Sequence, residues 1–214
     1  MQAGRIACAT LASMSDLTLS DLRRLYPPAK ARSLRKQLDR LDGHCQRFIA
    51  LSPFVVLSSA GPAGALDASP RGGDPGFVQV LDEHTLLIPD APGNNRLDTL
   101  ENVASTGRLG LLFLVPGVDE TLRVNGSAVL STRADWLDRC AIERRRPVLV
   151  VAVSVQEAYL HCAKALMRSR LWSPASLQPR SSLPTMGEML RDQIGGDTPA
   201  ETQARMLARY AADL

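Results

Sequence analysis

The feature that most constrains the fold is a series of short apolar or alternating runs separated by tight-turn residues. In the longest pair, the runs Leu109–Leu114 and Thr121–Ser131 flank Pro116-Gly117, a typical turn dipeptide. Similar runs are Phe54–Ala60, Ala65–Ser69, Phe77–Leu81, Thr85–Pro89 and Val148–Val153. Because consecutive runs joined by short turns pair as hairpins, we expect a mainly β protein with an antiparallel barrel, not a parallel α/β sheet.

Helices are expected before, within and after the strand runs. Thr18 or Ser20 can cap a short helix that Pro27-Pro28 ends. Leu34, Leu38, Leu41, Cys45 and Phe48 then form one stripe at helical spacing, which predicts a single longer helix up to Ser52. We predict a disordered leader over residues 1–17, one domain over 18–172 and a helical extension over 173–214.

Composition and missing motifs exclude several classes of protein. The chain has no G-x-G-x-x-G, G-x-x-x-x-G-K-[ST], G-x-S-x-G or H-E-x-x-H, so Rossmann, P-loop, α/β-hydrolase and zincin sites lose their main support. Its four cysteines and three histidines are scattered, which predicts no metal site and favours the reducing cytoplasm. A net charge of +3 and 4% aromatic residues argue against a nucleic-acid partner, and no run is long enough for a membrane span.

Three segments carry more special residues than a plain turn needs. Asp67–Gly76 contains Arg71 among Pro and Gly, and Pro89–Asp98 places Asn95 and Arg96 before an expected helix. Free N–H groups and the helix dipole favour an anion at such an N-terminus, although solvent-exposed loops explain both segments equally well. The third segment combines Glu120–Gly126, which includes Arg123, with a tail in which Lys164 and Arg168 lie one helical turn apart.

In this order, the segments resemble the pyridoxamine 5′-phosphate oxidase-like, FMN-binding split-barrel flavoproteins. The resemblance rests on S-P-R-G, P-G-N-N-R-L-D-T-L, G-L-L-F-L-V-P-G, E-T-L-R-V-N-G and H-C-A-K-A…R-S-R-L-W, and covers about Leu22 to Pro174. It is closest to a bacterial subfamily described as FMN-dependent enzymes. The resemblance implies a six-stranded antiparallel split β-barrel with flanking helices, a homodimer, and FMN at the subunit interface.

The resemblance also implies a set of cofactor-binding residues. Ser69, Pro70 and Arg71 would lie beside the isoalloxazine ring, and Pro89 and Asp90 would end the strand that passes the ribityl chain. Asn95 and Arg96 replace the basic pair that holds the FMN phosphate in the family, so one of its two charges is missing. Thr121 stands where the family often has a Gln against the ring, and Lys164 and Arg168 would reach the cofactor of the partner subunit. The full set is Ser69, Pro70, Arg71, Pro89, Asp90, Asn95, Arg96, Thr121, Lys164 and Arg168.

The function expected from the resemblance is flavin-mediated redox chemistry on a small organic substrate, with NADH or NADPH as a candidate electron donor. True pyridoxamine 5′-phosphate oxidases carry R-x-V-L-L-K and R-L-H-D-R segments, which this chain lacks, so we do not expect pyridoxamine phosphate to be the substrate. The flavin itself carries the chemistry, so no catalytic residue can be named from the sequence. A non-catalytic protein that binds FMN, haem or another cofactor on the same barrel is the alternative, and a basic nucleic-acid-binding barrel is a weaker one.

Overall fold

The structure is a computed structural model that describes residues 17–90, 93–142, 146–196 and 199–211. The chain divides into two units, residues 1–37 and 38–214. The first unit contains helices α2 (Leu19–Leu25) and α3 (Ala31–Arg35), neither of which buries a residue. Thr18 caps α2 in a reciprocal capping box with Asp21. All of the predicted leader except Leu17 lies outside the described residues.

The single helix predicted from the leucine stripe is wrong. α3 ends at Arg35, and α4 (Gly43–Leu51) is a separate helix that begins at a new cap, where Asp42 accepts a hydrogen bond from the Cys45 amide at 2.9 Å. In the second unit, the chain before α4 is extended, and Leu38 pairs with Ala158 of the last strand as an isolated β-bridge. The apolar residues from Leu34 to Phe48 therefore have helical spacing, but the bridge and the new cap divide them between two helices and an extended segment.

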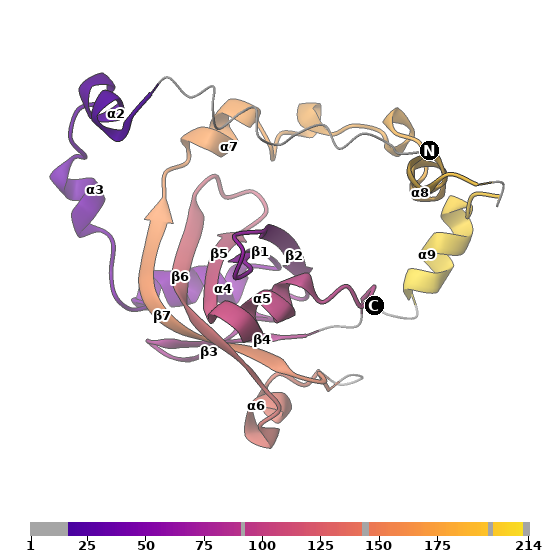
Figure 1. The fold of residues 1–214 in the computed structure, drawn as a ribbon, viewed down its shortest axis with the longest axis horizontal. Coiled ribbons are helices and arrows are strands. Elements are labelled where there is room, and N and C mark those ends of the chain that lie inside the picture. The colour runs from indigo at the N-terminus through magenta and orange to yellow at the C-terminus, as the bar shows by residue number, and fades with distance from the viewer. Residues whose placement is uncertain (1–16, 91–92, 143–145, 197–198, 212–214) are drawn as a thin grey trace. The chain divides into compact units, whose positions relative to one another are not determined.

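The second unit is built on one antiparallel sheet in the order β2-β1-β5-β6-β7-β4-β3 (Figure 1). The sheet therefore has seven strands and not the predicted six. At one edge, the short strand β3 pairs only with β4. The strands are β1 (Phe54–Ala60), β2 (Leu66–Gly72), β3 (Gln79–Asp82), β4 (Thr85–Pro89), β5 (Arg108–Leu114), β6 (Thr121–Ser131) and β7 (Val150–His161).

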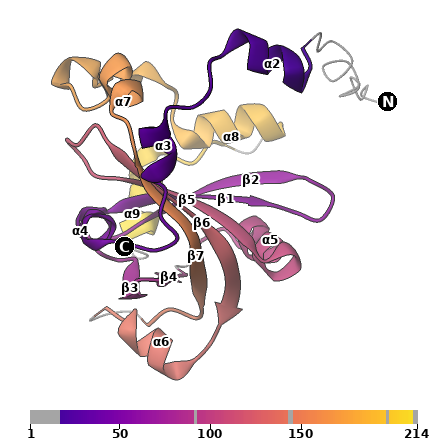
Figure 2. The same ribbon diagram turned by 90° about the vertical axis from the view of Figure 1, so that its left-hand side faces the viewer.

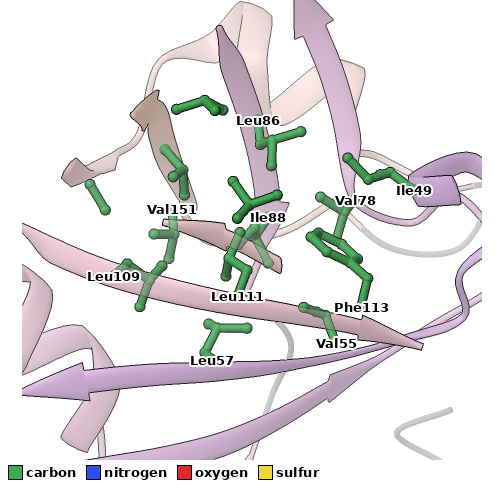
Figure 3. Packing of buried hydrophobic residues seen from close by; sticks show 14 of the residues in the cluster. Ile49, Val55, Leu57, Val78, Leu86, Ile88, Leu109, Leu111, Phe113 and Val151 are labelled. Atoms are coloured by element: carbon green, nitrogen blue, oxygen red, sulfur yellow. The ribbon is translucent and has the colours of Figure 1, made fainter. Parts of the chain in front are cut away.

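Alternating side chains on the strands form the core. Val55 and Leu57 of β1 and Leu111 and Phe113 of β5 are at most 2% exposed, whereas their neighbours along each strand are not fully buried. Strands from the two ends of the sheet contribute to the same cluster, in which Ile88 of β4 faces the β5 side chains (Figure 3). The sheet must therefore curve, so that it has an inner face towards the core and an outer face (Figure 2).

Helices lie against different parts of this sheet. α5 (Asp98–Thr106) packs against the β1–β2 hairpin, and α6 (Ala134–Arg139) buries Leu137 in a second cluster with Leu87 of β4 and Val150 of β7. After β7 the chain forms α7 (Lys164–Ser169), two short 3-10 turns (Pro174–Ser176 and Arg180–Ser182), α8 (Met186–Ile194) and α9 (Gln203–Ala211). Within the described ranges, no helix has both the length and the apolar character that crossing a membrane requires.

Candidate functional site

Strand β2 places three polar residues of the first candidate segment in one row. Asp67, Ser69 and Arg71 alternate with more exposed residues and pair with Ser59, Leu57 and Val55 of β1, whose side chains are buried. The row therefore lies on the inner side of an edge strand. The Arg71 guanidinium donates to the Ser69 hydroxyl at 2.5 Å and to the Pro70 carbonyl at 2.9 Å. Pro70 is compatible with this strand because an edge has no need of every amide donor.

Asp90 follows the last residue of β4 and lies within electrostatic range of Arg71. Its amide donates to the Leu149 carbonyl at 3.0 Å, which anchors the backbone directly after Pro89. Burial raises the pKa of the Asp90 carboxyl, and the nearby Arg71 opposes this rise. Arg71 therefore contacts Ser69 directly and acts on Asp90 through its charge.

The chain that enters α5 has an unusual backbone. Asn95 and Leu97 both have positive φ, of 59° and 60°, which is rare for residues other than glycine. The Asn94 side chain accepts from the Arg96 amide at 3.1 Å and therefore does not cap the helix. The N-cap residue is Leu97, which offers no side-chain hydrogen bond, so no cap side chain occupies the first amide donors of α5.

Arg96 lies at this uncapped helix end. Its Nε is 2.7 Å from an Asp98 carboxylate oxygen, and its side chain is 74% exposed. Asp98, and more weakly Asp67, raise the pKa of the Arg96 guanidinium. Asp67 belongs to the β2 row, so this end of the row lies near Arg96 while the Arg71 end lies near Asp90. We call this set the polar strip: it runs from Arg96 along the β2 row to Asp90, and the row consists of Asp67, Ser69 and Arg71.

The remaining predicted residues do not join this strip within one chain. Thr121 begins β6 and is in register with His161, on the outer side of the sheet, because its neighbour Leu122 is fully buried in the core. Lys164 and Arg168 lie on α7, just beyond the end of β7. Side-chain alternation therefore places Thr121 on the face of the sheet opposite to Ser69 and Arg71.

Sequence reasoning missed two groups of polar contacts. Thr99 of α5 and Ser59 of β1 are buried and contact Asp67, and neither stood out in the sequence. On the outer face, Arg123 donates to the Tyr159 hydroxyl at 2.8 Å. Thr99 is 32 residues from Asp67 and Arg123 is 36 residues from Tyr159, so only helix packing and strand register could identify these pairs.

The two hollows next to α4 do not coincide with the strip. They measure about 580 and 260 Å³, and Arg47 lines both. The larger one is bordered by β3 and the loop before it, and the smaller one is mainly apolar. None of the ten predicted cofactor residues lines either hollow. Among the described residues, no cluster of three or more His, Cys, Asp or Glu side chains could hold a metal ion.

Comparison with known proteins identifies the family model that fits the chain. The model described as pyridoxamine 5′-phosphate oxidase matches residues 41–162, which include every strand of the sheet. No curated protein sequence matches the chain.

Solved structures show similarity at low sequence identity. HupZ of Group A Streptococcus is 13% identical, with a TM-score of 0.46 over 56% of this chain and 92% of that one. An FMN-binding protein of Syntrophomonas wolfei is 12% identical, with a TM-score of 0.44 over 54% and 81%. An F420 reductase is 12% identical, with a TM-score of 0.38 over 54% and 94%.

Proposed function

Since the chain belongs to the pyridoxamine 5′-phosphate oxidase family, we propose that it is an FMN-dependent oxidoreductase that acts on a small organic molecule. The observation that carries this proposal is the polar strip, which joins an uncapped helix end beside Arg96 to the row Ser69–Arg71. The FMN phosphate carries about two negative charges at neutral pH, and free helix amides with an adjacent guanidinium are well suited to bind it. The donors present therefore fit the cofactor.

Each residue of the strip has a specific role in this proposal. Arg96 and Asn95 would hold the phosphate, with Arg96 exchanging its exposed contact with Asp98 for the phosphate. Such an exchange costs little, because an ion pair between exposed groups contributes only about 0–1 kcal/mol. Pro89 and Asp90 would lie along the ribityl chain, and Ser69, Pro70 and Arg71 would lie beside the ring. Bound FMN would supply hydride and electron transfer, whereas the protein supplies position, hydrogen bonds and exclusion of water.

Two copies of the chain would be needed to complete the site. Thr121 is on the outer face of the sheet and Arg71 is on the inner side of an edge strand, so one flavin can contact both only if they come from different subunits. We therefore propose a homodimer with FMN at its interface, to which Thr121, Lys164 and Arg168 contribute from the partner. Pyridoxamine phosphate is excluded from the proposal, because the segments that bind its phosphate are missing. We place the protein in the cytoplasm, with NADH or NADPH as the electron donor.

The proposal predicts a flavin absorption spectrum in freshly purified protein. If the protein is an enzyme, NADH or NADPH bleaches the bound flavin, and the colour returns with turnover when an acceptor is added. A stable yellow protein that no nicotinamide donor reduces would favour the non-catalytic alternative. Protein that neither purifies with flavin nor binds added FMN would contradict the proposal as a whole.

The Arg96→Ala variant tests the phosphate site directly. Loss of a charge-assisted contact of roughly 1.5–3 kcal/mol should weaken FMN binding about tenfold to 150-fold. Riboflavin lacks the phosphate, so its affinity should change little. Both ligands can be titrated by flavin fluorescence.

Arg133→Ala is a matched control for this experiment. Arg133 also pairs with an Asp two residues later, at 2.6 Å, but it lies at α6 and not at the strip. Its replacement should leave the affinity for FMN unchanged. Equal losses for FMN and riboflavin in Arg96→Ala would mean that Arg96 supports the fold, and an unchanged FMN affinity would place the phosphate elsewhere.

A further inference from the structure

A partly buried chain of hydrogen bonds links α5 to the β1–β2 hairpin. The Thr99 hydroxyl donates to an Asp67 carboxylate oxygen at 2.5 Å, and the Ser59 hydroxyl is 3.5 Å from the same oxygen. The Asn102 amide donates to the Ser59 hydroxyl at 3.0 Å. Two strands and one helix therefore meet at a single carboxylate, that of Asp67.

Burial makes these hydrogen bonds costly to lose. Thr99 is 3% exposed and Ser59 is 5% exposed, so neither hydroxyl has ready access to water as a substitute partner. Asn102 is packed closely as well, because a Cβ added at Gly61 would lie 3.0 Å from its side-chain oxygen. Leaving a buried polar group without a partner costs free energy. These hydrogen bonds therefore strongly favour one position of α5 relative to β2.

The same contacts explain how α5 begins without a cap. An ordinary N-cap side chain holds the first turn but occupies one of its amide donors. Here the first turn is held from outside, by the bond between Thr99 at the second helical position and Asp67 on the neighbouring strand. The helix end is thus fixed in place while its amide donors stay available.

We propose that Asp67 is a positioning residue for the flavin site, which acts through Thr99 to fix the N-terminus of α5 against β2. Asp67 lies in the same row as Ser69 and Arg71, so this contact sets the spacing between the phosphate end of the site and its ring end. The inference rests on the proposed function, because it presupposes that α5 and Arg96 bind the FMN phosphate. Its consequence is that selectivity for FMN over riboflavin depends on a residue that touches neither the ring nor the phosphate.

The test compares FMN and riboflavin affinities in the full-length protein. Thr99→Val removes the hydroxyl at nearly constant volume, and we expect roughly tenfold weaker FMN binding, since α5 would then occupy its binding position only about a tenth of the time. Riboflavin affinity should change less than about twofold, because riboflavin has no phosphate to contact the N-terminus of α5. Thr99→Ser keeps the donor and should restore the preference for FMN.

Two further variants separate positioning from stability and from charge. Thr106→Val removes a hydroxyl from the same helix, where it donates to the Asn102 carbonyl at 2.8 Å, and should leave both affinities unchanged. Asp67→Asn keeps an oxygen that can accept from Thr99 but removes a negative charge close to Arg96. It should therefore bind FMN at least as well as the wild type.

The outcomes distinguish this inference from the proposed function. A wild-type protein that does not prefer FMN to riboflavin would overturn the phosphate site and the inference with it. If the wild type prefers FMN and Arg96→Ala abolishes the preference, the phosphate site stands. In that case, equal changes for both ligands in Thr99→Val, or no change in either, would overturn the positioning role alone.

Discussion

Arg71 shows how one side chain in the strip depends on its neighbours. Its guanidinium is held by the Ser69 hydroxyl and the Pro70 carbonyl, and its charge lowers the pKa of Asp90, which follows β4. Desolvation and a nearby cation shift the pKa of Asp90 in opposite directions, and desolvation is the larger effect. The protonation state of Asp90 is therefore sensitive to Arg71.

The Arg71→Gln variant should raise the pKa of the Asp90 carboxyl further. Gln keeps hydrogen-bonding capacity but removes the positive charge that stabilises the carboxylate. Because the folded-state pKa of Asp90 lies above the unfolded value near 3.9, its contribution favours the folded protein at low pH and is lost as the pH rises through the folded pKa. Carboxyl titration by ¹³C NMR measures the shift directly. An unchanged or lower pKa in the variant would show that Arg71 does not act on Asp90.

At the scale of elements, α8 packs through a glycine against the segment that leads into α9. A Cβ added at Gly187 would lie 2.1 Å from the Glu201 carbonyl oxygen, which is closer than any real contact. Thr185 caps α8 with Glu188, and Glu201 pairs with Arg209 of α9 at 2.8 Å. The absence of a side chain at Gly187 is therefore a condition for the two helices to meet.

Gly187→Ala should separate this helix pair. In most helices Ala is more favourable than Gly by about 1 kcal/mol, but here the overlap with the Glu201 backbone reverses the sign and costs roughly 1–3 kcal/mol locally. Tryptic cleavage at Arg205 or Arg209 should become several times faster, while the thermal unfolding of the sheet stays the same.

Gly43→Ala is the control for this prediction. Gly43 is the first residue of α4, and a Cβ there meets nothing within 4 Å, so the variant should be neutral or slightly stabilising. Unchanged proteolysis in Gly187→Ala would mean that the α8–α9 contact does not persist in solution.

At the scale of the whole molecule, the outer face of the sheet has the features of an interface. Four residues on neighbouring strands are in register and form a row of short side chains: Ala68, Ser58, Gly110 and Asn125. Gly110 leaves room for the Asn125 side chain, whose oxygen would be 3.2 Å from a Cβ added at Gly110. A parallel row contains Val56, Leu112 and the Arg123–Tyr159 pair. Apolar side chains next to Arg and Tyr are typical of protein interfaces.

We predict that the wild type sediments as a dimer at micromolar concentration and that Ala68→Arg is a monomer. Ala68 is exposed on an edge strand, so Arg can be accommodated in the single chain but introduces a buried charge into the proposed interface. Ala134→Arg on the exposed side of α6 should remain a dimer. A monomeric wild type would contradict the dimer, and a dimeric Ala68→Arg would contradict this face. Flavin should be lost together with dimerisation.

Local sequence signals predicted most of the second unit because they act over a few residues. Turn residues such as Pro116-Gly117 and the alternation in Thr121–Ser131 are sufficient to specify a hairpin. The same local logic failed between Leu34 and Phe48. There, the helical spacing was real, but Asp42 started a new helix and Leu38 paired with a strand 120 residues later.

For the candidate site, too, some features follow from the sequence and others only from the tertiary structure. The sequence by itself determined the residue types that suit an anion, above all Arg71 and Arg96, because donor chemistry belongs to the side chain wherever it lies. Only the tertiary structure decided which of them share a face: strand alternation put Thr121 on the side opposite Arg71, and packing of α5 brought Thr99 to Asp67. The physical reason is that register and helix docking are determined by contacts summed over the whole sheet, which no single segment of sequence contains.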